Sequence, residues 1–464
     1  MLFTEKFAAD LDERQQKLTL AQPQSGMLDS AIWVHLTDSE NLFIQLMSGT
    51  PPPPDALGNL EQGWCLFFLN GKMPNVPLAI QLILVRLHPI LHLLGMPPTK
   101  ITTTQWNSWL AQLNGVGVLT GDGTLVSTAL YAQVDPGWAL SLLDYFLVQL
   151  NWINKVAFNP NGQQIQVSNK STLQVALFSD WGTGAYQDGH LSGSPAQLVM
   201  QQIKSQAPDM VIHLGDVYYS GTYGLFGAKT GEEYTKLVTQ WTYQAPLGNF
   251  TLNSNHEMYD GGNGLFNVAL NSSITSLFQA QGNASFFSIS FGNWLILGLD
   301  SAYYADAKTM YMTGAILDPA QQQLLQQAGT SGKKIMILTH HNPINEIGTI
   351  QNELWTDVVS HLGKNPDYWY WGHVHNGIVY SETSVAGRVC CRCVGNGAIP
   401  IGQASWFANN SAISFYTNSP LGDTAPRNAL RIKNGFAHLT FAMDTVQEQW
   451  FYQDGSLAWS SSGA

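Results

Sequence analysis

Charged side chains are scarce in this sequence. Asp, Glu, Lys and Arg make up only 11% of its 464 residues, against about 25% in an average soluble domain. Acidic residues outnumber basic ones by 32 to 20, which gives a net charge of −12, and the basic residues form no cluster. A surface that binds nucleic acid needs a basic patch to pair with phosphates, so we expect no nucleic-acid partner.

Cysteine is also rare, at four residues: Cys65, Cys390, Cys391 and Cys393. The run VCCRCVG does not have the spacing of a zinc site, and no framework of disulfides is evident. If this run forms a strand, Cys391 and Cys393 point to one face and Cys390 points to the other. We interpret these residues as reduced thiols in a packed strand, which favours a reducing compartment.

Long apolar runs without interruption are lacking as well. The longest apolar stretch, residues 77–96, contains Arg86, Pro89 and His92, so we interpret it as a buried helix and expect no membrane span. Residues 1–17 mix acids and bases without an apolar centre and do not look like a secretory signal. We therefore expect a cytoplasmic protein, and the oligomeric state stays open.

The pattern of apolar and polar residues changes near residue 157. Residues 1–157 carry apolar side chains at helical spacing, most clearly at 103–117 and 137–156, and predict a mainly helical N-terminal domain of unknown role. The segment 158–171 is polar and rich in turn-forming residues, and we place the domain boundary there. Two domains suit a chain of this length.

The second region, residues 172–464, alternates short β-rich runs with helical stretches. This order predicts an α/β domain in which helices flank β-sheets. Residues 435–456 predict a terminal β-hairpin. The β-rich runs are 173–180, 209–216, 293–300, 333–341 and 367–375, and the helical stretches are 194–208, 232–246, 318–332 and 352–363.

Polar residues with metal-binding side chains follow the apolar runs in five short motifs. The carboxyl ends of strands in open α/β sheets are where functional sites gather. Two carboxylates, a phenol, an amide oxygen and three imidazoles are a donor set that suits two metal ions. In a strand, residues i and i+2 share a face, so both histidines of WGHVHN can reach neighbouring metals. The motifs are FSDWGTG with Asp180, HLGDVYYSG with Asp216 and Tyr219, NSNHE with Asn255 and His256, ILTHHNP with His340 and His341, and WGHVHN with His373 and His375.

Taken in order, these motifs resemble the signature D-x-G, GDxxY, GNH[DE], VxxH and GHxH of the calcineurin-like metallophosphoesterases, and within them the purple acid phosphatases. The resemblance covers about residues 172–460. It implies a four-layer α/β sandwich, in which two mixed β-sheets are flanked by helices. The chain departs from the signature at Ser254, which stands where the family has a glycine. If that position needs a positive φ, serine adds strain.

The resemblance also assigns a role to each motif residue. His256 would not bind metal but would face the phosphoryl group and assist the leaving oxygen. The implied metals are Fe(III), held by the phenolate, together with Fe(II), Zn(II) or Mn(II). One metal would be held by Asp180, Tyr219 and His375, the other by Asn255, His340 and His373, and Asp216 would bridge both.

The motif ILTHHNP leaves two candidates for one ligand. The apolar strand leads directly into His340, which we take as the ligand, whereas the frequent H-x-P spacing of the family fits His341. If His340 binds the metal, His341 lies behind it or near the substrate. We therefore group His341 with His256 as catalytic residues.

The implied activity is hydrolysis of a small phosphate monoester by attack of a metal-bound hydroxide on phosphorus. Two metals in such sites clamp the attacking and leaving oxygens of an in-line displacement. A phosphodiesterase or cyclic nucleotide phosphodiesterase with the same site is an alternative, because the metal ligands do not report the shape of the pocket. Another alternative is a binding or interaction protein with a secondary or inactive phosphoesterase domain, since catalysis has no obvious need of the helical segment before residue 155.

Overall fold

The structure is a computed structural model that describes residues 117–119, 125–126, 130–132, 138–149, 151, 153–224 and 227–461. Most of the predicted N-terminal domain, including the apolar stretch 77–96 and nearly all of 103–117, lies outside these residues. Among the helices described, none is both long and apolar enough to cross a bilayer. The described parts before residue 157 include the helix α6 (Trp138–Gln149), within the stretch 137–156 where a helix is predicted, and the antiparallel pair β1 (Val118–Leu119) and β2 (Leu125–Val126).

The larger of two main sheets has the strand order β13-β11-β12-β10-β9-β8-β7-β3. It is mixed, since β8, β9, β10 and β12 run parallel while β11 and β13 are antiparallel to their neighbours. Its strands are β3 (Gln163–Val167), β7 (Phe287–Phe291), β8 (Trp294–Gly298), β9 (Lys334–Leu338), β10 (Tyr368–Trp371), β11 (Gly377–Tyr380), β12 (Cys390–Val394) and β13 (Ile413–Tyr416).

The second main sheet has the order β16-β15-β14-β4-β5-β6. Strands β4, β5 and β6 run parallel, and the predicted terminal hairpin, β14 with β15, is confirmed and pairs antiparallel with β4. Its strands are β4 (Leu173–Phe178), β5 (Met210–His213), β6 (Asn249–Thr251), β14 (Gly435–Phe441), β15 (Val446–Tyr452) and β16 (Leu457–Ser460).

The helices begin where the local sequence provides caps. In α7 (Pro195–Gln206), Ser194 and Gln197 form a capping box and Pro195 occupies the first turn. The other α-helices are α8 (Asn255–Tyr259), α9 (Pro319–Thr330) and α10 (Glu353–Leu362); short π-helical turns lie at Glu233–Val238 and Leu265–Ala269, and 3-10 turns at Ala307–Thr309, Ser405–Phe407 and Pro426–Asn428.

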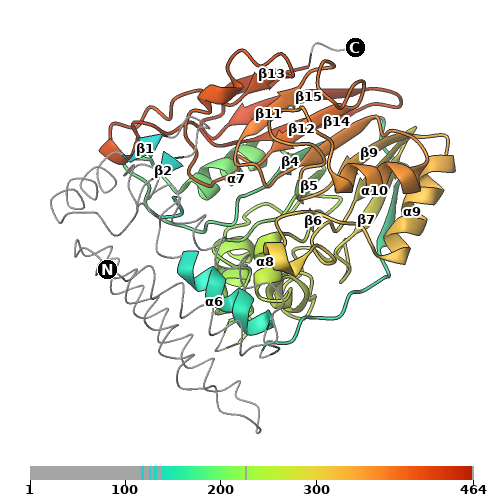
Figure 1. The fold of residues 1–464 in the computed structure, drawn as a ribbon, viewed down its shortest axis with the longest axis horizontal. Coiled ribbons are helices and arrows are strands. Elements are labelled where there is room, and N and C mark those ends of the chain that lie inside the picture. Colours follow the sequence, from blue (N-terminus) through green and yellow to red (C-terminus); the bar gives the residue numbers. More distant parts are fainter. Residues whose placement is uncertain are drawn as a thin grey trace, which may run out of the picture.

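Three apolar clusters hold these elements in four layers. Between the two sheets, residues such as Leu177 of β4 and Ile289 of β7 are fully buried. The helices α9 and α10, which lie side by side (Figure 1), cover the outer face of the larger sheet, and α7 packs on the outer face of the smaller one. Strands buried on both faces read as nearly continuous apolar runs, which is why their positions are visible in the sequence. The predicted α/β sandwich of two mixed sheets flanked by helices is confirmed.

Two segments differ from the sequence-based expectation. The polar segment 158–171 contains the edge strand β3, which pairs parallel with β7 and exposes its glutamines to solvent. The stretch 232–246, for which a helix is predicted, forms only the π-helical turn Glu233–Val238 before the chain becomes irregular. By contrast, the strand predicted for VCCRCVG is β12, with Cys391 and Cys393 fully buried together and Cys390 partly exposed.

Candidate metal centre

The motif residues gather where parallel strands of both sheets end. Asp180 follows β4 and Asp216 follows β5 in the smaller sheet, while His340 and His373 follow β9 and β10 in the larger one. Asn255 is the first residue of α8, a few residues beyond β6. Residues far apart in the sequence therefore meet at one edge, as expected for the carboxyl ends of parallel strands.

The backbone is unusual at three of these positions. Asp180, Asp216 and His373 have φ angles of 56°, 82° and 64°. This left-handed region is costly for residues other than glycine, and such residues concentrate where surrounding structure holds them for a functional reason. The turn after each strand thus bends so that these side chains point at the same space.

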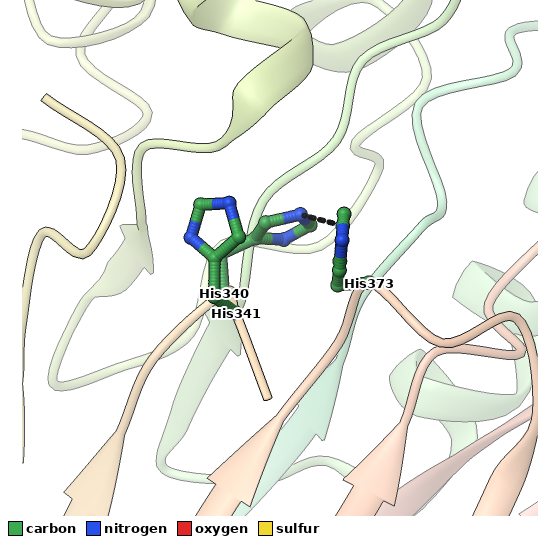
Figure 2. A group of neighbouring side chains, drawn as sticks. All are labelled: His340, His341 and His373. Atoms are coloured by element: carbon green, nitrogen blue, oxygen red, sulfur yellow. Dashed lines mark hydrogen bonds between the residues drawn. The ribbon is translucent and has the colours of Figure 1, made fainter. Parts of the chain in front are cut away.

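One group of donors surrounds the Nε2 atom of His340. This atom lies 2.9 Å from Asn255 Oδ1, 3.2 Å from His373 Nδ1 and 3.2 Å from Asp216 Oδ1. On the other side of the ring, His340 Nδ1 lies 2.9 Å from the carbonyl oxygen of Leu214. A carbonyl only accepts hydrogen bonds, so Nδ1 carries a hydrogen and Nε2 is the nitrogen turned toward the group. Figure 2 shows His340 and His373 turned toward each other from neighbouring strand ends.

These atoms fit a cation better than they fit one another. The amide nitrogen of Asn255 donates to Tyr259 Oη over 3.0 Å, which leaves Oδ1 facing His340. An amide oxygen, a carboxylate oxygen and an imidazole nitrogen therefore converge, and the two oxygens repel each other unless a positive charge lies among them. Oxygen and imidazole nitrogen are donors that suit Fe, Zn or Mn ions.

A second group surrounds the hydroxyl of Tyr218. This oxygen lies 2.8 Å from Asp180 Oδ1, 2.8 Å from Asp216 Oδ2 and 3.0 Å from His375 Nε2. His375 Nε2 is itself 3.3 Å from Asp180 Oδ1. One hydroxyl hydrogen cannot serve both carboxylates fully, and the two carboxylates, the phenol oxygen and an imidazole nitrogen together form a second set of atoms that can bind a metal.

Asp216 belongs to both groups. Its Oδ1 atom faces His340, and its Oδ2 atom faces Tyr218. A carboxylate whose two oxygens serve two adjacent donor groups has the arrangement of a bridging ligand, and it fixes the spacing of whatever the groups bind.

The two acidic residues differ in their electrostatic surroundings. Burial and the neighbouring Asp216 charge raise the pKa of the Asp180 carboxyl. Burial acts in the same direction on Asp216, but the imidazoles of His256 and His340 outweigh it and hold the pKa of Asp216 well below its usual range. Asp216 is therefore the carboxylate that these surroundings keep ionised.

The tyrosine at this site is Tyr218, whereas the spacing Asp+3 predicts Tyr219. The Tyr219 ring packs against Tyr131 and Trp138, with ring centroids 4.8 and 5.1 Å apart, and Lys236 Nζ lies 4.8 Å from its centroid. The structure thus brings Tyr218 into the donor group and places the Tyr219 ring in an aromatic cluster beside it. Two adjacent tyrosines differ only in which way the chain turns after Asp216, and spacing carries no signal for that.

His341 lies behind His340 and makes two hydrogen bonds of its own. Its Nε2 atom is 2.7 Å from the carbonyl oxygen of Tyr311, and its Nδ1 atom is 2.8 Å from Ser301 Oγ. The carbonyl requires a hydrogen on Nε2, so Nδ1 accepts from the serine, and both ring nitrogens are engaged. Burial and the neighbouring His340 lower the pKa of His341 to about 3, which keeps it neutral. Although His340, His341 and His373 lie close enough together to share an ion, His340 and His373 face the other donors directly.

His256 points from the second position of α8 toward the same space. Its Nε2 atom lies 3.8 Å from Asp216 Oδ2, and its Nδ1 atom lies 2.5 Å from the carbonyl oxygen of Tyr219. The ring packs against Tyr218, with centroids 4.5 Å apart. The structure therefore places His256 beside both donor groups, with one nitrogen turned to the protein and one toward the site.

Ser254 does not carry the strain that its replacement of glycine suggests. Its φ is −139°, an extended conformation open to any residue, and its hydroxyl caps α8 by accepting from the His256 amide over 3.0 Å. The same hydroxyl lies 2.5 Å from Asp216 Oδ1 and also contacts Glu257 Oε2. Burial, followed by the charges of Glu233 and Asp216, raises the pKa of Glu257, so Glu257 can donate to Ser254 while Ser254 donates to Asp216.

His373 and His375 differ from the expected strand arrangement. Strand β10 ends at Trp371, and both histidines lie in the bend that follows. The alternation of side chains along a strand therefore does not determine where the two histidines point. The positive φ of His373 and the hydrogen bond from its backbone amide to Asp180 Oδ2, at 2.9 Å, set the bend instead.

The sandwich of two mixed sheets, with oxygen and imidazole donors at the strand ends, defines a metallophosphoesterase-type fold. A family model described as calcineurin-like phosphoesterase matches residues 173–377, so this part of the chain carries a calcineurin-like phosphoesterase domain. This segment contains every residue of the two donor groups. No curated protein matches the sequence.

Three solved structures are similar to parts of this chain. GAP50, the anchor in the inner membrane complex of Plasmodium, aligns with a TM-score of 0.41 and 14% identity over 63% of this chain and 88% of its own. A conserved uncharacterized protein from Streptococcus pneumoniae, described as a predicted phosphoesterase, aligns with a TM-score of 0.26 and 9% identity over 63% of this chain and 97% of its own. A single mutant of Vps29 from Entamoeba histolytica aligns with a TM-score of 0.23 and 12% identity over 61% of this chain and 96% of its own.

Proposed function

We propose that this protein hydrolyses small phosphate monoesters at a centre of two metal ions. The observation that carries the proposal is the position of Asp216, whose two oxygens face two separate groups of donors. In this proposal Asn255, His340 and His373 hold one ion, while Asp180, Tyr218 and His375 hold the other. The domain match at residues 173–377 supports the same class of reaction.

Two cations held there would lower the pKa of a bound water and offset the charge on the phosphoryl oxygens, which is the chemistry that hydrolysis of a phosphate ester needs. The ligand set suits Fe(III) on the Tyr218 side, with Fe(II), Zn(II) or Mn(II) on the other. The left-handed turns at Asp180 and Asp216 hold these carboxylates in place before any substrate arrives. Such preorganised positions contribute to catalysis because no reorganisation is needed during the reaction.

His256 supplies the proton in the proposed reaction. Its Nε2–H gives a proton to the leaving oxygen as the bond between that oxygen and phosphorus breaks, and the product is an alcohol. The ring becomes neutral and keeps its hydrogen on Nδ1, where the Tyr219 carbonyl accepts it. Proton transfer of this kind typically contributes ~10²–10⁴-fold to the rate.

The proposal is tested by replacing the bridging carboxylate. We expect the Asp216→Asn protein to bind fewer than two metals per chain and to hydrolyse p-nitrophenyl phosphate ~100-fold or more slowly, because a ligand of both ions is lost. Asp444→Asn is the matched control: Asp444 is exposed in the turn between β14 and β15, at the opposite end of the strands. Unchanged activity in Asp216→Asn, with metal content also unchanged, would overturn the proposal.

The preference for monoesters is tested on the wild-type protein. Rates with p-nitrophenyl phosphate and bis-p-nitrophenyl phosphate are compared at the same pH and metal content. A higher kcat/KM for the monoester supports the proposed substrate class. A higher value for the diester keeps the centre but makes the protein a phosphodiesterase, and no hydrolysis of either ester by metal-loaded protein rejects the enzymatic proposal.

A further inference from the structure

Helix α6 lies next to α8 (Figure 1). Ser141, on its first turn, is 2% exposed, and its hydroxyl donates to the carbonyl oxygen of Tyr219 over 2.9 Å. This bond spans 78 residues of sequence and enters the calcineurin-like domain from outside the segment that the family model matches.

The same carbonyl oxygen receives a second hydrogen bond, from His256. His256 Nδ1 lies 2.5 Å from it, and a carbonyl cannot donate, so the hydrogen is on Nδ1. Ser141 and His256 therefore hold one acceptor between them. Because Nδ1 is turned to this carbonyl, Nε2 is the nitrogen on the side of Asp216, 3.8 Å from its Oδ2 atom.

Trp138 packs beside the imidazole of His256. Its ring centroid lies 5.6 Å from that of His256, 5.7 Å from that of Tyr218 and 5.1 Å from that of Tyr219. The indole is itself held, since Nε1 donates to the carbonyl oxygen of Ala132 over 2.8 Å. A tilt of His256 away from the site would require Trp138 to move, and Trp138 is 7% exposed and packed on several sides.

The other end of α6 is tied to a different part of the domain. Tyr145 Oη donates to the carbonyl oxygen of Ala307 over 2.6 Å, and Gln149 Nε2 donates to Tyr311 Oη over 3.1 Å. The helix is thus held at both ends, so Ser141 and Trp138 present a fixed surface to His256. Residues fixed by packing in this way can orient a catalytic group more accurately than residues on a free loop.

We propose that Ser141 and Trp138 are positioning residues that orient the His256 imidazole for proton transfer, so that α6 completes the active site. The proposal rests on the function proposed above. In it, the hydrogen bond from Nδ1 and the contact with Trp138 keep Nε2 directed at the leaving oxygen. Helix α6 is then part of the catalytic unit rather than of a separate binding module.

The test depends on the leaving group. An ester of an alkyl alcohol needs a proton on its leaving oxygen, whereas p-nitrophenolate leaves without much help. We expect Ser141→Ala, which frees the Tyr219 carbonyl that holds Nδ1, and Trp138→Phe to lower kcat for an alkyl phosphate ~10-fold or more, a part of the ~10²–10⁴-fold that a proton donor supplies. Both should change kcat for p-nitrophenyl phosphate less than threefold. A structural defect would slow both substrates equally, and equal slowing, or none, would overturn the proposal.

Two further variants test whether the effect on the rates comes from the orientation of His256. Tyr145→Phe removes one of the two ties at the far end of α6 but leaves the Gln149 bond and the contacts of Ser141 and Trp138 in place, so it should keep the wild-type ratio of the two rates. In a His256→Gln background, Ser141→Ala should add no further loss with the alkyl ester, because groups that act through one another are not additive. Full additivity of the two substitutions would contradict the assignment.

A spectroscopic measurement separates this proposal from the proposed function. In metal-free protein with ¹⁵N-labelled histidine, the His256 resonances should show hydrogen on Nδ1 in the wild type, and a shifted Nδ1 resonance in Ser141→Ala, because the carbonyl that holds Nδ1 has lost its second donor. If the wild-type protein hydrolyses no ester but this shift occurs, the proposed function has failed while the positioning contact stands. If the Nδ1 resonance is the same in both proteins, the positioning role is rejected whatever the activity.

Discussion

The Oδ1 atom of Asp216 lies 3.2 Å from Nε2 of His340, although the two residues follow strands of different sheets. The contact joins the end of β5 to the end of β9 across the layer between the sheets. It places a carboxylate oxygen against the ring nitrogen opposite the one that donates to the Leu214 carbonyl. Carboxylate oxygens and imidazole nitrogens are both ligands that metal ions accept, so the sandwich itself brings metal-binding atoms together.

Ser254 provides the first prediction, because its hydroxyl lies 2.5 Å from the same Asp216 oxygen. We expect Ser254→Ala to weaken metal binding ~10–100-fold, as the loss of a group that orients a ligand usually does. The loss of the helix cap adds about 1 kcal/mol of destabilisation. Metal affinity is measured by competition with a chelator, and stability by urea unfolding of the metal-free protein.

The glycine variant Ser254→Gly is the matched comparison. It restores the residue of the family signature and also removes the hydroxyl, while glycine at a cap costs only a few tenths of a kcal/mol relative to serine. Both variants should therefore lose metal affinity to a similar extent, and the alanine variant should be the less stable. Wild-type metal affinity in both would show that the Ser254 hydroxyl does not orient Asp216.

Tyr218 and Tyr219 give the second prediction. If Fe(III) occupies the side of Asp180, a phenolate bound to it produces a visible charge-transfer band. We expect Tyr218→Phe to remove this band, because the Tyr218 hydroxyl lies within 3.0 Å of three donors of that group, and Tyr219→Phe to retain it. Absorption spectra of the iron-loaded proteins decide the matter. A band that survives in Tyr218→Phe and disappears in Tyr219→Phe would show instead that Tyr219, the residue with the Asp+3 spacing, binds the iron.

The sequence is informative about the elements that end at the site. Strands such as β4 and β9 are buried on both faces, so they appear as apolar runs, and the polar residue at which each run stops is visible at once. Asp180 and His340 could therefore be selected as candidates without a structure. Strand β3 is not predicted from the sequence, because an edge strand with exposed glutamines has no apolar pattern.

Other features depend on contacts that local sequence does not encode. The choice between Tyr218 and Tyr219 depends on the path of the backbone after Asp216. The hydrogen bond of Ser141 to the Tyr219 carbonyl joins residues 78 positions apart, and the contact of Trp138 with His256 joins residues more than a hundred positions apart. Helical periodicity predicts α6 itself, but it does not say which side chains of the helix face the site.

The third prediction concerns a buried ion pair that links the two sheets. Arg392 of β12 donates from Nε and Nη2 to the two carboxylate oxygens of Glu448 of β15, over 2.9 and 3.0 Å, and Tyr370 Oη donates to Glu448 Oε1. Glu448→Gln leaves the guanidinium without its counter-charge, which typically costs about 3–5 kcal/mol in a buried pair. Urea unfolding measures the loss, while metal content per folded chain should stay the same.

Tyr370→Phe is a milder substitution at the same ion pair than Glu448→Gln. It removes one hydrogen bond to Glu448 but leaves the ion pair, so we expect a loss of about 1 kcal/mol, near the net value of a single hydrogen bond. If Glu448→Gln cost no more than Tyr370→Phe, the pair would contribute nothing to stability beyond that bond.

His213 provides the last prediction, on the dependence of stability on pH. It is fully buried at the end of β5, with Nδ1 at 3.1 Å from Thr251 Oγ1, and burial lowers its pKa to about 3. An unfolded histidine has a pKa of about 6.5, so below that pH the unfolded chain takes up a proton that the folded chain does not, and stability falls as the pH falls. Between pH 7 and pH 5 this costs about 2 kcal/mol, which His213→Phe avoids. Urea unfolding in the presence of a chelator should therefore show the free energy of unfolding of the wild type falling by about that amount relative to that of His213→Phe as the pH falls over this range. The other buried histidines are common to both proteins and cancel in the comparison. A difference between the proteins that stays constant with pH would mean that folded His213 titrates like an exposed histidine.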